Sequence, residues 1–301
     1  MKNQSILGIS TYKKTGPVGS LHYNQLLKEG QKCFDEVIFI NPDNVVYQFE
    51  RSGMKLLYND RDLTDINAFI VRGVQYHERA VSLLAHSLSG LGCFLLDPLE
   101  RFSGARDDKM LPSLERMKEK SGVDSYLMFS KEAAERFLHD FFDHQAQPIL
   151  AKPVAGRKGK GIALLHNFDD AINYINEYFK GNFDDNPILF QRYIKIREEF
   201  RVVVLHGKHL GTAKKQPIAG ALTANAAQGA TFAADDRPDI VEFVLQHVRS
   251  DAFLGVDVVQ DDQGDMFIIE ANYAPVWQEF ERVTGVNVAK EVVKFCAEQV
   301  K

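Results

Sequence analysis

Two carboxylates and an amide near the end of the chain have the spacing of a metal site on a hairpin. Asp257 and Glu270 flank Gln263-Gly264, a dipeptide that favours a two-residue turn. Counting back from that turn, Asp257 faces Glu270, and Asn272 lies on the same face. Two directly opposed anions repel unless a cation or water separates them, and oxygen ligands without His or Cys favour Mg²⁺. A solvent-facing acidic hairpin is the alternative interpretation.

A pair of basic residues upstream is placed by the same counting of strand pairs from a turn. A turn at Gly207-Lys208 predicts that Arg201 faces Lys214 on adjacent strands. Glu199 points to the same side as Arg201, because side chains alternate along a strand. Two cations beside a carboxylate suit a site that handles phosphate, whereas an exposed basic ribbon with a balancing Glu is the alternative. The presence of both opposed pairs in one segment favours a common site.

A glycine-rich loop follows a buried strand that ends in a lysine. The segment 153–161 carries three glycines, Gly156, Gly159 and Gly161, together with basic side chains, as a loop that closes over phosphate requires. It lacks the spacing of a P-loop, and a flexible surface turn is the alternative. Lys152 strengthens the phosphate interpretation, because a lysine at the end of an apolar strand is costly to bury without an anion. Lys109, in the first turn of a predicted helix, is a second candidate.

The elements that must position these residues form three regions. Residues 1–103 alternate apolar strands (6–9, 37–40, 68–71, 93–96) with helices (21–31, 78–88), which predicts a βαβ-type α/β domain with a mostly parallel sheet. This first domain has no GxGxxG motif or nucleophile elbow, so we interpret it as a support. Residues 104–186 predict a small α+β lobe that contains the glycine loop, and residues 187–301 predict a larger lobe with both hairpins.

Composition restricts the class of protein. The 301 residues are 45% hydrophobic and 26% charged, which is typical of a globular chain, and the net charge of −5 disfavours nucleic acid as a partner. The three cysteines show neither disulfide nor zinc spacing, so a reducing compartment, the cytoplasm, is expected. No signal peptide or membrane span is predicted.

Taken in order, these motifs resemble the ATP-grasp superfamily, and most closely its RimK-like carboxylate–amine ligases. The resemblance covers about residues 104–301. It rests on Arg106-Asp107-Asp108-Lys109, Lys152 before the glycine loop, Gln191-Arg192-Tyr193-Ile194, Glu199 with Arg201, and Asp257 with Glu270-Ala271-Asn272, followed by the tail 272–289. It implies an ATP-grasp fold behind an N-terminal pre-ATP-grasp domain.

The resemblance also implies roles and a reaction. The implied roles are Lys109 and Lys152 for ATP phosphates, Gly156, Gly159 and Gly161 for the closing loop, Gln191, Arg192 and Tyr193 for the adenine hinge, Glu199 for ribose, and Asp257, Glu270 and Asn272 for Mg²⁺, with Mn²⁺ as an alternative ion. A carboxylate attacks the γ-phosphate to give an acylphosphate, which an amine captures. We assign Arg201 and Lys214 to the charge that spreads over the reacting phosphate.

Two departures from the family pattern concern the adenine hinge and the loop expected to act on the acyl acceptor. Arg192 stands where an acidic residue is usual, and the loop 216–234 contains no charged residue, although relatives carry an arginine shortly before the position of Asn225. The uncharged loop leaves a second function open, a non-catalytic ATP-binding regulator on the same fold. The leading hypothesis remains an ATP- and Mg²⁺-dependent ligase for small-molecule or peptide carboxylates and amines, with no membrane partner and with a homo-oligomer to be considered.

Overall fold

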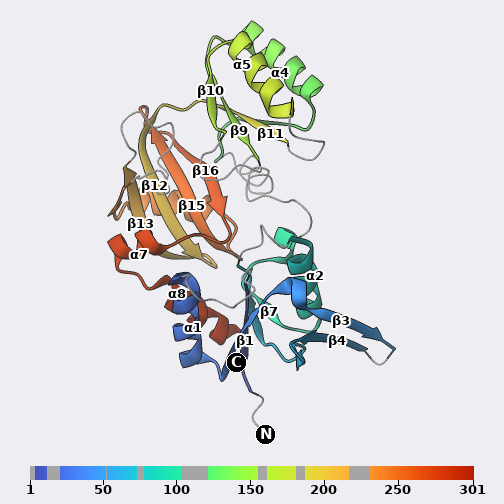
Figure 1. Ribbon diagram of the computed structural model, residues 1–301. Helices are drawn as coiled ribbons and strands as arrows, with labels where there is room; N and C mark the ends of the chain where they lie inside the picture. The colour runs from blue at the N-terminus through green and yellow to red at the C-terminus, as the bar shows by residue number, and fades with distance from the viewer. Residues whose placement is uncertain are drawn as a thin grey trace.

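The computed structural model describes residues 4–11, 21–51, 53–72, 78–102, 121–154, 161–180, 187–216 and 231–301. The helix start with Lys109, the loop residues Gly156 and Gly159, and Asn225 lie outside these ranges. Figure 1 shows three parts along the length of the molecule: a small sheet with two helices at one end, a large sheet in the middle, and an α/β domain at the other end.

The N-terminal domain is built on a parallel sheet with the strand order β2-β1-β6-β7. Its elements are β1 (Ile6–Ser10), α1 (Leu21–Cys33), β2 (Glu36–Ile40), η1 (Pro42–Asn44), β6 (Ala68–Ile70), α2 (Glu78–Gly90), β7 (Phe94–Leu95) and η3 (Leu99–Phe102). The predicted alternation of strands and helices is confirmed for this sheet. A second sheet, which the sequence pattern did not predict, consists of β3 (Val46–Glu50), β4 (Gly53–Tyr58) and β5 (Arg61–Asp62), and its hairpin projects from the domain (Figure 1).

The small lobe is an antiparallel sheet covered on one side by two helices. Its elements are β8 (Ser125–Met128), α4 (Lys131–His144), β9 (Ile149–Pro153), β10 (Ala163–Leu165), α5 (Phe168–Lys180) and β11 (Ile188–Arg192). The strand order is β10-β9-β11-β8, so β11 belongs to this sheet although it begins beyond residue 186, where we expected the lobe to end. The apolar faces of α4 and α5 pack on the sheet through a core of their own, which includes Leu138, Ile175 and Phe190.

The large lobe is a five-stranded antiparallel sheet with the order β14-β13-β12-β15-β16. Its elements are β12 (Ile196–Leu205), β13 (Lys208–Gln216), β14 (Thr231–Ala234), α6 (Pro238–His247), β15 (Phe253–Asp261), β16 (Met266–Asn272), α7 (Gln278–Thr284) and α8 (Val288–Gln299). Helix α6 covers one face of the sheet, where Phe200, Val202 and Val256 are buried. The opposite face carries the charged residues of the candidate site.

The C-terminal helix returns to the N-terminal domain. In Figure 1, α8 lies beside α1, and the two helices share one core with the lower end of the large sheet. Leu26 of α1, Val293 of α8 and Phe253 of β15 are all buried in this cluster. Chain ends that are distant in sequence therefore hold the first domain against the large lobe. Among the described residues, none of the helices combines the length and the apolar character that a membrane span needs.

Candidate active site

The charged face of the large sheet brings together one acid and two cations on three neighbouring strands. Arg201 on β12 is the direct cross-strand partner of Asp257 on β15, so both side chains lie on the same face. The guanidinium donates two hydrogen bonds, from Nε to Oδ1 at 2.5 Å and from Nη2 to Oδ2 at 2.8 Å. This two-pronged geometry is the strong form of an arginine–carboxylate pair.

Lys215 on β13 completes the cluster. Its ammonium group lies 2.8 Å from Oδ1 of Asp257 and donates a hydrogen bond of 2.6 Å to Oε1 of Glu199. Glu199 is the cross-strand partner of Lys215, so their approach follows from the strand register. Side-chain exposure is only 4% for Lys215 and 5% for Asp257, which means that these charges depend on one another rather than on water.

Electrostatics at Asp257 reflect this crowding. Burial by itself raises the pKa of the carboxyl group, but Arg201 and Lys215 outweigh burial and hold the pKa of Asp257 below its usual value. Asp257 is therefore an anion at neutral pH, with both oxygens already engaged by cations. A polyanion that attracted Arg201 and Lys215 would release a carboxylate oxygen for another ligand.

Glu270 and Asn272 lie beside this cluster on the adjacent strand β16. The predicted pairing of Asp257 with Glu270 is confirmed, and Asn272 pairs with Gly255. The predicted turn at Gln263-Gly264 is wrong: the loop is one residue longer and is closed by a hydrogen bond from the N–H of Asp261 to the carbonyl of Asp265. A β-bulge near Ile269 then shifts the register back, so two differences from the expected geometry cancel.

In the hairpin of β12 and β13 the differences from the expected geometry do not cancel. The predicted pairing of Arg201 with Lys214 is therefore wrong. The turn of this hairpin is His206-Gly207, with φ of 45° and 75° as a type I′ turn requires, rather than Gly207-Lys208. A bulge after Val203 follows, and Arg201 faces Ala213. Lys214 therefore points to the opposite face of the sheet, because a slip of one residue reverses every side chain.

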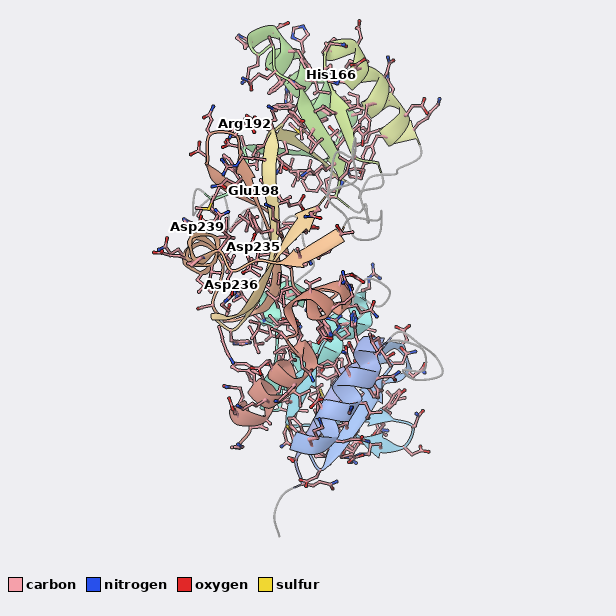
Figure 2. The ribbon with its side chains drawn as sticks, turned by 90° about the vertical axis from the view of Figure 1, so that its left-hand side faces the viewer. His166, Arg192, Glu198, Asp235, Asp236 and Asp239 are labelled. Carbon is pink, nitrogen blue, oxygen red and sulfur yellow. The ribbon has the colours of Figure 1, made fainter. Side chains whose placement is uncertain are left out.

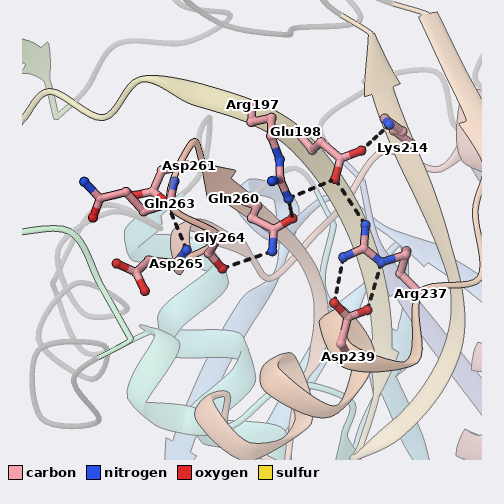
Figure 3. A network of polar contacts seen from close by, with 10 residues as sticks. All are labelled: Arg197, Glu198, Lys214, Arg237, Asp239, Gln260, Asp261, Gln263, Gly264 and Asp265. Carbon is pink, nitrogen blue, oxygen red and sulfur yellow. Dashed lines mark hydrogen bonds and ion pairs between the residues drawn. The ribbon is translucent and has the colours of Figure 1, made fainter.

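On that opposite face Lys214 joins a separate ionic network (Figure 3). It donates to Glu198, which also lies 3.1 Å from a guanidinium nitrogen of Arg237, and Arg237 in turn pairs with Asp239 at 2.6 Å. Figure 2 shows Glu198 and Asp239 on one side of the molecule, near α6. This network belongs to the α6 side of the sheet, so Lys214 does not share the site of Asp257.

In the small lobe, Lys152 lies at the end of β9 and is half-buried. Its ammonium group donates a hydrogen bond of 2.6 Å to Oε1 of Gln191 on β11, and Nε2 of Gln191 donates to Oγ of Ser125 at 2.8 Å. Leu189 pairs with Lys152, which places Gln191 on the same face of the sheet. Gln191 and Ser125 thus orient the lysine, and Ser125 had no signal in the sequence.

Comparison with known proteins decides the family. The model of the RimK-like ATP-grasp domain matches residues 109–296 of this chain. The chain belongs to the RimK-like ATP-grasp family. The expected ATP-grasp fold and the expected class, an ATP-dependent carboxylate–amine ligase, are confirmed.

Relatives of this RimK-like protein span nearly its whole length. A protein of Maridesulfovibrio salexigens named "Probable alpha-L-glutamate ligase" is 23% identical over 90% of each chain, and one of the same name from Legionella pneumophila is 23% identical over 93% of this chain and 92% of its own. The ATP-grasp ligase PsnB, solved with a minimal precursor, superposes with a TM-score of 0.70 at 15% identity over 99% of both chains. The D-cycloserine synthetase DcsG superposes with a TM-score of 0.68 at 13% identity, over 99% of this chain and all of that one.

Arg192 of the expected hinge is the last residue of β11, and Tyr193 follows it. The backbone N–H of Arg192 donates to the carbonyl of Asp124 at 2.9 Å, so this amide is engaged within the protein, and the guanidinium lies 5.5 Å from the ring centre of Phe267. Tyr193 is 38% exposed beside it.

Gly161, the described glycine of the loop, has a backbone φ of 77°, and a Cβ there would lie 2.7 Å from Pro153. Both the backbone conformation and the lack of space therefore require glycine at this position.

The residues expected to hold a metal ion are two carboxylates and one amide. Within the ranges that the structure describes, no three His, Cys, Asp or Glu side chains gather in a way that could hold a metal ion. Asp257, Glu270 and Asn272 nevertheless supply the oxygen donors that Mg²⁺ takes when phosphate and water complete its ligands.

The sequence analysis missed Lys215 and chose its neighbour Lys214 instead, because only the strand register decides which of the two lysines faces the site.

Replacing Lys152 is expected to weaken nucleotide binding. Loss of one charged hydrogen-bond donor to phosphate costs about 1.5–3 kcal/mol, so we expect the Kd of AMPPNP for Lys152→Ala to rise about 10- to 100-fold. Isothermal titration calorimetry measures this directly. Lys131→Ala, which removes a half-exposed lysine on α4 of the same lobe, is the matched control and should bind as the unchanged protein does. An unchanged affinity for Lys152→Ala would remove this lysine from the nucleotide site.

Proposed function

We propose that this protein activates the carboxylate of an amino acid or peptide with ATP and joins it to an amine, and that the cluster around Asp257 is its reaction centre. The observation that carries the proposal is the shared face of Arg201, Lys215, Asp257 and Glu270, where two cations and two anions lie on adjacent strands. A reacting phosphate develops charge on its oxygens, and fixed cations stabilise that charge.

Each residue of the candidate site is assigned a role from its position. We propose that Lys152, oriented by Gln191, binds nucleotide phosphate, and that Glu199 binds the ribose. We propose that Asp257, Glu270 and Asn272 hold Mg²⁺, which neutralises phosphate charge when it is bound. PsnB has been solved with Mg and ADP, and with AMPPNP. That precedent supports the same ligands here.

The reaction balances without a redox partner. A carboxylate oxygen of the substrate forms a bond to the γ-phosphorus, and the bond from that phosphorus to the bridging oxygen of ADP breaks. The amine nitrogen then attacks the acyl carbon, phosphate leaves, and the nitrogen loses a proton. Arg201 and Lys215 are positioned to stabilise the charge of the transferred phosphate, as residues with a fixed, water-excluded location do. Their existing contacts with Asp257 hold them on the reacting face.

Glu270→Ala is expected to abolish amine-dependent release of ADP. Loss of one of two carboxylates from a metal site removes the charge that holds the ion near the phosphates. The measurement is ADP release with ATP, Mg²⁺ and a panel of amino acids and peptides. Glu279→Ala, which removes an exposed carboxylate of α7, is the control and should leave turnover unchanged. Tight ATP binding without turnover on any acceptor would contradict a ligase and favour a regulator.

A further inference from the structure

A buried arginine of the N-terminal domain lies beside the candidate reaction centre but takes no part in it. Arg72 follows β6 at the carboxyl edge of the parallel sheet and is only 8% exposed. Its backbone is fixed by Ser10 at the end of β1, which accepts from the N–H of Arg72 and donates to its carbonyl, both at 2.6 Å. The carboxyl edge of a parallel sheet is where α/β domains bind ligands.

The guanidinium of Arg72 is incompletely bonded. Nη2 donates to the carbonyl of Pro275 at 3.2 Å, and the group lies 4.7 Å from the ring centre of Trp277. Nη1 is buried and makes no hydrogen bond within the described part of the protein. Asp97, the carboxylate that acts on it electrostatically, pairs with Arg101 instead. Burying a cation without a carboxylate partner is costly, which is typical of a site that receives an anion from elsewhere.

Among the described residues near Arg72, His22 brings no charge of its own. His22 of α1 lies 4.4 Å from Trp277, measured between ring centres, and burial together with Arg72 lowers the pKa of His22 to about 4. His22 is therefore neutral at neutral pH, and its Nε2 accepts from the backbone N–H of Trp277. Burial also lowers the pKa of Arg72 to about 10, which still leaves it fully charged under physiological conditions. Among the described residues, Asp97 acts on this positive charge electrostatically, but Nη1 of Arg72 has no hydrogen-bond partner.

Two residues, Pro275 and Gly255, connect Arg72 to the reaction centre. Pro275 accepts the hydrogen bond from Arg72 and also packs on Gly255, the strand partner of Asn272. A Cβ at Gly255 would lie 2.6 Å from Cβ of Pro275 and 3.2 Å from Nη1 of Arg201. A chain of direct contacts thus joins Arg72, through Pro275 and Gly255, to Arg201 and Asp257.

We propose that Arg72 binds a carboxylate of the substrate that does not react, held at the junction of the N-terminal domain and the large lobe. This inference rests on the proposed function, because it takes the neighbouring cluster as the place where the acyl group is activated. The nucleotide phosphates already have Lys152, Arg201 and Lys215, so a planar carboxylate is the ligand that the remaining guanidinium donors suit. Arg72 would then select substrates that carry a second acidic group.

The only tryptophan of the chain reports on this site. Trp277 packs against both Arg72 and His22, so an anion that reaches Nη1 changes the surroundings of the indole. The protein is first saturated with AMPPNP and Mg²⁺ and then titrated with L-glutamate, while the emission of Trp277 is followed. We expect a saturable change, and Arg72→Met is expected to raise the apparent Kd about tenfold or more. Arg72→Lys keeps the positive charge but loses the two parallel N–H donors of the guanidinium, so it should bind L-glutamate with intermediate affinity.

Two amides identify the carboxylate. Isoglutamine lacks the α-carboxylate and glutamine lacks the γ-carboxylate, so the amide that still responds in an Arg72-dependent way retains the bound group. Arg72→Met removes a buried charge, so the unfolding midpoint of this variant should not fall. If the role of Arg72 were purely structural, the same replacement would lower the midpoint. Equal titrations for the unchanged protein and Arg72→Met, or no saturable response to L-glutamate, would overturn the inference.

The titration also separates this inference from the proposed function. A saturable, Arg72-dependent response without ADP release on any acceptor would refute the ligase and retain the carboxylate site. Normal turnover with a KM for the carboxylate substrate that Arg72→Met leaves unchanged would retain the ligase and refute the site. If both hold, Arg72→Met should raise that KM and leave the Kd of AMPPNP unaltered.

Discussion

Asp257→Ala is expected to lower the free energy of unfolding by about 3–5 kcal/mol, because it leaves Arg201 and Lys215 buried without their shared partner. Both cations lie within 2.8 Å of the carboxylate, and Asp257 is 5% exposed at its side chain. Turnover should also be lost, since the same residue is a proposed metal ligand. Chemical denaturation measures the stability, and ADP release measures the activity.

Matched variants separate this effect from a general loss of acidic charge. Asp265→Ala removes an exposed carboxylate from the loop of the same hairpin and should change the stability little. Adding Arg201→Met to Asp257→Ala should recover part of the lost stability, since one of the two unpaired cations is then gone. No recovery in the double variant would show that Arg201 and Asp257 are not energetically coupled.

The same carboxylate predicts part of the acid sensitivity. Because the pKa of Asp257 is lower in the folded protein than in the unfolded chain, its contribution is complete above the unfolded value, near pH 4, and is lost as the pH falls through the folded value. Asp257→Asn, which cannot titrate, should therefore lose less stability than the unchanged protein as the pH falls below about 4. Denaturation curves measured across this range test the sign.

Lys215→Met is expected to reduce kcat/KM about 10²- to 10³-fold, whereas Lys214→Met should leave it close to that of the unchanged protein. The two lysines are adjacent in sequence but lie on opposite faces of the sheet. Lys215 contacts Glu199 and Asp257 in the site, while Lys214 contacts Glu198 in the network beside α6 (Figure 3). The pair is thus a comparison in which charge and position in the chain are nearly the same.

Stability must be measured with activity for this pair. Lys215→Met leaves two buried carboxylates short of a cation, so it should also destabilise the fold, and assays belong well below its unfolding midpoint. Lys214 is 34% exposed at its side chain, and its ion pair is expected to contribute about 0–1 kcal/mol. Loss of turnover in Lys214→Met with normal turnover in Lys215→Met would contradict the assignment of faces.

Local pattern was sufficient for most of the elements. The helices predicted over 21–31 and 78–88 are α1 and α2, and the strands predicted near 6, 37 and 68 form where expected, because apolar period and turn residues are properties of neighbouring residues. The motif order from Lys152 to Asn272 was likewise sufficient to indicate the family. The β3–β4 hairpin was missed, since its exposed residues, such as Val46 and Phe49, do not alternate with buried ones.

Which face each charge occupies was decided by the tertiary structure. Strand side chains alternate with a period of two, so one bulge or one displaced turn exchanges the faces of every following residue, and bulges leave little trace in sequence. Two such shifts cancelled at Asp257 and Glu270 but not at Lys214, where Lys215 took the site instead. The surroundings of Arg72 depend on the packing of the domains as well as on strand register. Its hydrogen-bond partner Pro275 is 203 residues away in sequence and contacts Arg72 only when the domains pack.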